Sequence, residues 1–223
     1  MRREALDKLL QKRSEPAPLA TKEITLPEYA EHEVGMIPQL AARFETAAQL
    51  PGAEYLAKLR YLILPIREAD AVPQPLRCKT LLELPRAAFG TVEPDTMRRL
   101  AALEGSGFAG VVANNLAQFG YASPLPMFGG LGLNVTNPMS AAEYVCLGAC
   151  GLLVQPETAL TAMRAVAPRQ KDGTPVPTAA LCYGHLPLML TRACPLRNVR
   201  TSCAGCTHKG KLRDRKGRDF PVR

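Results

Sequence analysis

Short apolar runs of strand length alternate with segments of helix length through most of the chain, and this alternation limits the fold more than any other feature. Runs such as Gly110–Ala113 are apolar at every position, as expected for strands buried on both faces of a parallel sheet. Strands that alternate with helices form a mostly parallel sheet covered by helices. We therefore expect an α/β fold, a (β/α) barrel or an incomplete TIM-type barrel, with a doubly wound open sheet as the alternative.

The expected elements follow from apolar periodicity and turn residues. Strands are predicted at Gln39–Phe44, Tyr61–Ile66, Thr80–Leu84, Ala109–Ala113, Gly132–Val135, Gly151–Val154 and Thr178–Tyr183. Helices are predicted at Arg2–Arg13, Thr46–Leu59, Pro94–Glu104, Asn115–Gly120, Ser140–Leu147 and Glu157–Val166. Ser140 is expected to be an N-cap, with Glu143 completing a capping box. Gly129, Gly130 and Gly132 are expected to form a turn that enters a strand.

The chain divides into three regions by composition. Residues 1–37 read as a helix and a polar linker, residues 38–190 as the barrel-like domain, and residues 191–223 as an irregular, Cys-rich C-terminal segment. Prolines and glycines interrupt any periodicity in this last region, so a bound metal is expected to order it.

Composition favours a cytoplasmic protein with no membrane segment. Hydrophobic residues make up 47% of the chain, but no apolar run approaches the roughly 20 residues that span a bilayer. The N-terminus lacks the apolar stretch of a signal peptide. The 7 cysteines are therefore expected to be reduced, as buried side chains, reactive thiols or metal ligands.

The net charge of +8 lies entirely in the C-terminal segment from Arg192 onward, because basic and acidic residues are equal in number in the rest of the chain. Such a block attracts RNA or a small anionic molecule, although it could also be a solvated tail. The cations expected to contact an anion are Arg192, Arg197, Arg200, Lys209, Lys211, Arg213 and Arg215.

Three cysteines in the same segment have ligand-like spacing. Cys203 and Cys206 form a C-x-x-C pair, and Cys194 precedes them. Zinc and iron–sulfur clusters both take four ligands. The fourth could be Cys182, His208, His185 or a residue beyond Arg223, and the alternative is three unrelated thiols.

Polar residues stand at the ends of the predicted strands, where parallel strands of a barrel place an active site. They are Arg43, Glu45, Arg86, Asn114, Asn115, Asn134, Asn137, Glu157 and His185. Glu157 could act as an acid or base, and Arg86 could hold a carboxylate or phosphate. Alternatively, Glu157 caps its helix and Asn137 begins a turn before Pro138.

Three C-terminal motifs resemble peptidase family U32, the collagenase-like proteases. These are the stretch from Tyr183 to Pro195, the Cys203-Ala-Gly-Cys206 motif and the stretch from Leu212 to Val222. Upstream, Leu84-Pro-Arg86, Leu133-Asn-Val-Thr-Asn137 and Pro156-Glu157 are similar too. The resemblance is to the C-terminal part of a long member, with Met1 to Leu6 similar to the helix that closes a first domain. It therefore implies an N-terminal barrel domain, or a partner supplying it, and a further Cys just past Arg223.

The resemblance implies a cluster-dependent enzyme more readily than a protease. Several family members take part in hydroxylation of tRNA, ribosomal RNA or ubiquinone precursors, and carry an iron–sulfur (4Fe-4S) cluster on comparable cysteines. The sequence has no recognisable Ser/His/Asp or Cys/His triad and no H-E-x-x-H motif. We expect an RNA-modifying enzyme, with a metal-dependent peptidase and a zinc-stabilised nucleic-acid-binding module as alternatives. Arg86, Asn134, Asn137, Glu157 and His185 would form its site.

Overall fold

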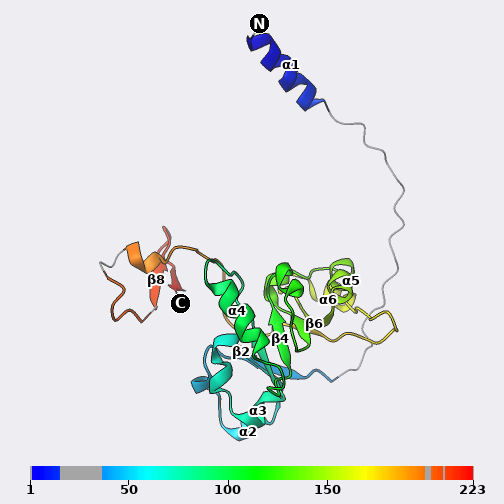
Figure 1. The fold of residues 1–223 in the computed structure, drawn as a ribbon, viewed down its shortest axis with the longest axis vertical. Helices are drawn as coiled ribbons and strands as arrows, with labels where there is room; N and C mark the ends of the chain where they lie inside the picture. Colours follow the sequence, from blue (N-terminus) through cyan, green and yellow to red (C-terminus); the bar gives the residue numbers. More distant parts are fainter. Residues whose placement is uncertain (1, 16–36, 199–201, 208, 223) are drawn as a thin grey trace.

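Seven parallel strands form the central sheet of the computed structural model, which describes residues 2–15, 37–198, 202–207 and 209–222. The strands lie in chain order and curl into an incomplete TIM-type barrel (Figure 1). They are β1 (Leu40–Arg43), β2 (Leu59–Pro65), β3 (Thr80–Glu83), β4 (Gly110–Ala113), β5 (Met127–Gly129), β6 (Ala149–Val154) and β7 (Thr178–Ala180). A doubly wound sheet reverses its strand order at a switch point, so the uniform order excludes that alternative.

Short helices and turns connect the strands and cover one face of the sheet. The longer helices are α4 (Val92–Ala101) and α5 (Pro138–Cys146). The shorter ones are α2 (Ala53–Leu56), α3 (Gln74–Arg77), α6 (Leu160–Arg164), η1 (Ala47–Gln49), η2 (Ile66–Ala71), η3 (Leu116–Gly120) and η4 (Leu131–Leu133). In α4, Glu93 and Asp95 lie in the first turn and Arg98 and Arg99 in the last, which complements the helix dipole.

The hydrophobic core consists of two clusters between the sheet and these helices. The first joins β2, β3 and β4 to α4, for example through Leu64, Leu82 and Leu100. The second joins β6 to α5 through Leu152, Val154 and Ala141. The loops at the strand ends are therefore held on a rigid support.

The two ends of the chain have little contact with this core. The described side chains of α1 (Arg2–Ser14) are exposed. At the other end, η5 (Pro195–Asn198) is followed by an antiparallel hairpin of β8 (Gly210–Arg213) and β9 (Asp219–Val222). The segment that was expected to be irregular thus contains a small hairpin. None of the helices in the described part of the chain combines the length and apolar character that crossing a bilayer needs.

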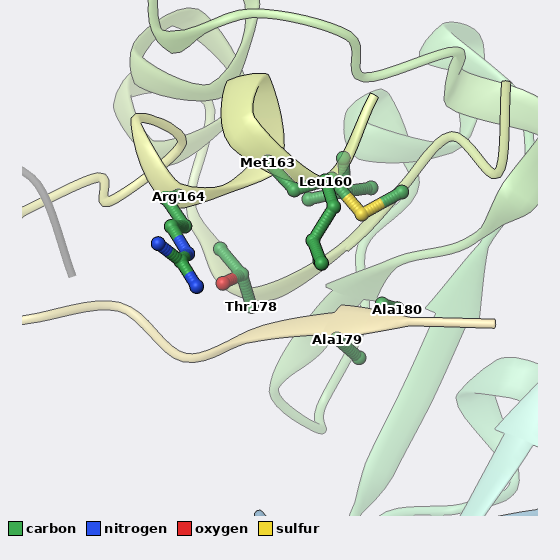
Figure 2. Close-up of a pocket in the computed structure, with 7 residues that line it drawn as sticks. Leu160, Met163, Arg164, Thr178, Ala179 and Ala180 are labelled. Atoms are coloured by element: carbon green, nitrogen blue, oxygen red, sulfur yellow. The ribbon is translucent and has the colours of Figure 1, made fainter. Parts of the chain in front are cut away.

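The open edge of the sheet at β7 carries a small, shallow groove of about 180 Å³ (Figure 2). Leu160, Met163 and Arg164 of α6 line one side, and the short strand β7 lines the other. The lining is mostly apolar, as expected where a barrel would continue with another helix but the sheet ends.

The predicted strand Gly132–Val135 is wrong, because the fifth strand lies earlier, at Met127–Gly129. A Cβ at Gly129 would run into the side chains of Leu133 and Leu152, so this glycine allows close packing inside a strand. Residues 131–133 form the turn η4 instead, and Val135 forms an isolated bridge with Val154.

Two helix predictions also need correction. The helix expected over Thr46–Leu59 is broken into η1 and α2, because Pro51 and Gly52 interrupt it. The helix expected to start at Ser140 starts at Pro138, with Asn137 as its N-cap. The Asn137 side chain accepts a hydrogen bond from the Ser140 amide at 2.9 Å, and proline at the first helical position suits this start.

Candidate functional site

A cleft of about 640 Å³ lies at the carboxyl ends of strands β3 to β6. We call it the strand-end cleft. Its lining includes five polar or charged side chains predicted from the sequence. These are Arg86, Asn114, Asn115, Asn134 and Glu157. The volume is within the range of small-molecule sites, about 300–1,000 Å³. The structure therefore gathers residues that are far apart in sequence at the place where a barrel carries its chemistry.

Arg86 is the cation of this cleft. Its half-buried guanidinium forms no hydrogen bond or ion pair with any residue in the described part of the chain. Burial lowers the pKa of Arg86, the nearby Glu83 carboxylate opposes this effect, and Arg43 adds to it. An arginine nevertheless stays protonated at neutral pH. Arg86 thus presents an unpaired positive charge that fits a carboxylate or phosphate.

Gln118 fixes the backbone beside Arg86. Its side chain is buried, and its Nε2 donates a hydrogen bond to the Pro85 carbonyl at 2.7 Å. Its Oε1 accepts from the amides of Asn114 at 2.7 Å and Asn115 at 3.2 Å. One amide side chain therefore joins the ends of β3 and β4, and it holds the residue before Arg86 in place.

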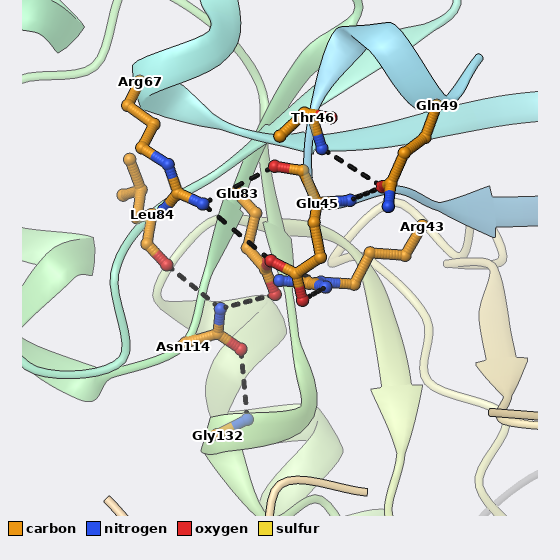
Figure 3. Close-up of polar contacts among 9 residues, drawn as sticks. All are labelled: Arg43, Glu45, Thr46, Gln49, Arg67, Glu83, Leu84, Asn114 and Gly132. Carbon is orange, nitrogen blue, oxygen red and sulfur yellow. Dashed lines mark hydrogen bonds and ion pairs between the residues drawn. The ribbon is translucent and has the colours of Figure 1, made fainter. Parts of the chain in front are cut away.

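Asn114 forms a second clamp on the same strands (Figure 3). Its Nδ2 donates to the Leu84 carbonyl at 3.1 Å and to Glu83 Oε1 at 3.2 Å. Its Oδ1 accepts from the Gly132 amide at 3.2 Å. A Cβ at Gly132 would collide with the Asn114 carbonyl, so glycine is required for the loop after β5 to reach this clamp.

An ion-pair network continues from this clamp to the end of β1 (Figure 3). Arg43 Nε lies 2.7 Å from Glu83 Oε2, and Arg43 Nη1 lies 2.9 Å from Glu45 Oε1. Arg67 Nη2 lies 3.8 Å from the other Glu45 oxygen. Burial lowers the pKa of Arg43, but the two carboxylates outweigh this and raise it. Arg43 and Glu45, predicted as site residues, thus brace the mouth of the barrel and do not line the cleft.

The far side of the cleft is built around Asn134 and Gln155. Asn134 adopts the left-handed conformation (φ 52°, ψ 46°), which asparagine tolerates better than most residues. Its Oδ1 accepts a hydrogen bond from Gln155 Nε2 at 3.1 Å, while Gln155 Oε1 is buried without a partner in the described chain. Glu157 is exposed on the same side of the cleft. This side therefore offers two amides and a carboxylate to a ligand.

Two predicted site residues lie elsewhere. Asn137 caps α5, which is the alternative considered for it, and it does not line the cleft. His185 is exposed on the segment that follows β7 and is outside the set of described residues lining the cleft. Glu83, Gln118 and Gln155 were missed. Glu83 lies inside a predicted strand, Gln118 lies inside a predicted helix, and Gln155 lies between a predicted strand and a predicted helix. For Glu83 and Gln155, the position next to a predicted strand end was the available signal, whereas Gln118 had no such signal.

The cysteine segment does not form a metal site in this arrangement. Cys194 and Cys203 are exposed and Cys206 is partly buried. The Cys206 amide donates to the Cys203 carbonyl at 3.2 Å, and Gly205 has a positive φ of 68°, so a tight turn joins this pair. Across the described residues, no three His, Cys, Asp or Glu side chains come together in a group that could hold a metal ion. These residues as placed do not fit a cluster, and His208 lies outside the described residues.

The cations of the C-terminal segment are spread over its turns. Arg213 and Lys211 pair with Asp219, at 2.7 Å and 3.4 Å. Arg215, Lys216 and Arg218 are exposed at the hairpin turn, which Asp214 orders by accepting from the amides of residues 216 and 218. Arg192 lies over Phe89, Arg197 is in η5, Lys209 precedes β8, and Arg200 lies outside the described residues.

Comparisons with known proteins return one structural likeness. No family model matches the chain, and no curated protein sequence matches it significantly. The structure is similar to that of the U32 peptidase Mk0906, with a TM-score of 0.40 and 12% sequence identity, over 62% of this chain and 71% of that one. The likeness concerns the course of the backbone.

Proposed function

We propose that the strand-end cleft is the active site of a U32-type enzyme that modifies RNA. The unpaired guanidinium of Arg86, half-buried at the ends of parallel strands, is the observation that supports this most. It would bind a phosphate of the RNA or the carboxylate of a small cosubstrate. A charge-assisted, bidentate contact of this kind is strong and directional.

The other polar groups of the cleft have complementary roles in this proposal. Glu157, which is exposed at the cleft, would accept or donate a proton at the reacting group. Asn134 and Gln155 would orient the substrate through their amides. The clamps at Gln118 and Asn114 hold the backbone before Arg86 and the loop that leads to Asn134, so these two groups lie on rigid strand ends.

The basic C-terminal segment would supply affinity for the RNA backbone. Its exposed cations, most clearly Arg215, Lys216 and Arg218 at the hairpin turn, are placed for phosphate contacts. Binding should therefore weaken steeply as salt rises. An enzyme that acts on tRNA or ribosomal RNA would work in the cytoplasm. A further barrel domain, in the same polypeptide or in a partner, would extend the RNA-binding surface.

The cofactor remains a separate part of the proposal. The family resemblance implies an iron–sulfur (4Fe-4S) cluster, or zinc, on Cys194, Cys203 and Cys206. The described arrangement does not bring these thiols together, so the roles given to the cleft residues do not depend on a cluster. Iron and sulfide analysis of anaerobically purified protein tests the cofactor independently of the cleft.

The decisive experiment compares two arginine variants. Arg86→Ala should weaken binding of a 20-nucleotide RNA or abolish modification detected by mass spectrometry, with a loss of tenfold or more, since a hydrogen bond to a charged group is worth about 1.5–3 kcal/mol. Arg164→Ala, at the exposed groove beside β7, is the matched control and should behave as wild type. Equal activity of the two variants would contradict the proposal. Cleavage of casein that is lost in Glu157→Ala would instead support a peptidase.

A further inference from the structure

Residues 184–194 form a strap between β7 and η5 that lies against the strand-end cleft. Leu186, Pro187, Leu188 and Leu190 of this strap line the cleft beside Arg86. The strap also leads directly into the basic segment, because Arg192 is both the first cation of that segment and a residue of the strap. The same stretch of chain thus contacts the candidate active site and the candidate RNA-binding region.

Few interactions hold the strap in place. Among the described residues, no hydrogen bond joins 184–193 to the rest of the protein. Leu188, Met189 and Leu190 remain 74%, 70% and 62% exposed. Gly184, at the start of the strap, has a φ of 145°, which a side chain would disfavour. The strap is therefore a segment that can move at low cost relative to the clamped strands beneath it.

One specific contact does attach the strap beside the cleft. The Arg192 guanidinium lies over the Phe89 ring, 5.4 Å from its centroid. Phe89 is in the loop between β3 and α4, three residues after Arg86. It is 51% exposed, so the ring contributes little to the core. An exposed contact of this type is weak, and a phosphate is a stronger partner for the same guanidinium.

We propose that the strap couples RNA binding to access to the cleft, with the Arg192–Phe89 contact as its latch. When a single-stranded RNA binds the basic segment, a phosphate takes Arg192 from Phe89 and the strap lifts from the cleft. The apolar strap residues then leave the cleft, and Arg86 becomes available to the substrate. This inference rests on the proposed function, because it requires that the basic segment binds RNA.

Limited digestion with chymotrypsin tests the latch, because Tyr183, Leu188, Met189 and Leu190 provide cleavage sites within or beside the strap. The full chain is digested with and without a 20-nucleotide poly(U) RNA, and mass spectrometry identifies cuts at these residues. RNA should raise the rate of strap cleavage in the wild type by about two- to fivefold, the factor that corresponds to losing an exposed cation–π contact.

Variants separate the latch from general loosening. Phe89→Ala should raise strap cleavage by the same factor without RNA, and RNA should add little to it. Arg192→Gln, which removes the other partner of the contact, should give the same strap cleavage as Phe89→Ala, both with and without RNA. Tyr55→Ala is the matched control, because Lys58 lies over the exposed Tyr55 ring at 5.6 Å in a similar contact far from the strap in sequence. Its strap cleavage should equal that of the wild type.

Fluorescence anisotropy of labelled poly(U) reports binding separately from cleavage. If RNA binds but strap cleavage stays constant or falls, the coupling is wrong while the proposed function stands. If Phe89→Ala cleaves like the wild type without RNA, the latch is wrong. If RNA does not bind at physiological salt, the proposed function and the coupling both fail.

Discussion

The strand ends of β3 to β6 and the chain beyond β7 are built in opposite ways. Around Asn114 and Gln118, buried amides join three neighbouring strands, and glycines let the backbones approach closely. Beyond β7, the strap carries exposed leucines and no hydrogen bond to the rest of the described chain. The first region is ordered by its own contacts, whereas the second gains order from whatever it binds. Substitutions should therefore affect stability in the first region and binding in the second.

The largest effect is expected at Gly132. Gly132→Ala places a Cβ against the Asn114 carbonyl. This carbonyl belongs to the backbone, so it cannot avoid the clash by a change of rotamer. The loop must shift and the Asn114 clamp weakens, so unfolding free energy should fall by about 3 kcal/mol. Urea denaturation followed by circular dichroism measures the loss.

Two controls define the contrast for Gly132. Gly120→Ala adds a Cβ with no atom within 4 Å and should change stability by less than about 0.5 kcal/mol. In the strap, Leu188→Ala should be similarly mild because the side chain is 74% exposed. If Leu188→Ala destabilises as much as Gly132→Ala, the strap is part of the core and the comparison fails.

Gln118→Leu is the next largest change. Leucine has a similar size but leaves the Pro85 carbonyl and the Asn114 amide without their buried partner. Each unsatisfied group has a desolvation cost, and we expect a loss of about 2 kcal/mol in thermal or urea unfolding. The exposed Gln170 supplies the matched variant Gln170→Leu, for which near-wild-type stability is expected. Equal stability of the two variants would mean that the clamp contributes nothing.

A smaller effect, on binding alone, is expected at the hairpin turn. Arg215→Gln removes an exposed cation from a segment that should contact phosphates. The slope of log affinity against log salt should become shallower by about 0.7 for single-stranded RNA. Lys211→Gln should change it less, because Lys211 already pairs with Asp219 at 3.4 Å. Fluorescence anisotropy at four salt concentrations measures both slopes, and unchanged slopes in both would exclude the hairpin from the interface.

The smallest effect concerns the Asp219 carboxylate. Its hydrogen bond with Arg213, with Lys211 adding to it, lowers the pKa of Asp219 below the ordinary aspartate value. A lowered folded-state pKa stabilises the hairpin above the unfolded pKa, and this contribution disappears as the pH falls through the folded value. Carbon-detected NMR should show Asp219 titrating below its usual range, and Arg213→Gln should move the midpoint upward. A midpoint unaffected by Arg213→Gln would show that the pair does not persist in solution.

The fold was largely predictable because a parallel sheet with covered faces leaves a simple signal. Runs such as Gly110–Ala113 stay apolar at every position and are bounded by turns. The failure at Gly132–Val135 has a physical cause. Glycines usually mark turns, but Gly129 lies within a strand so that Leu133 and Leu152 can pack against it. That requirement depends on how β5 packs against Leu152 of the next strand, and it leaves no local pattern.

The site was predictable only in part, for a related reason. Arg86 and Glu157 follow predicted strands, so the rule that parallel strand ends converge was enough to bring them together. Asn134 also lines the cleft, but it follows the turn η4 and not the end of the strand predicted over Gly132–Val135. The role of Gln118 depends on its hydrogen bond to the Pro85 carbonyl, 33 residues earlier, and no sequence spacing predicts such a contact. The sequence also suggested one site for three cysteines, but their assembly depends on the fold of a segment with few contacts of its own.

The order of the strands has a consequence for how the chain folds during synthesis. Each strand pairs with the next one along the chain, from β1 beside β2 to β6 beside β7. No strand must wait for a partner that is made much later. Contacts of this kind have short sequence separations, which favours rapid folding for a parallel sheet. As the chain leaves the ribosome, the clamped strand ends can form in sequence, and the strap and hairpin emerge after them, onto a surface that is already in place.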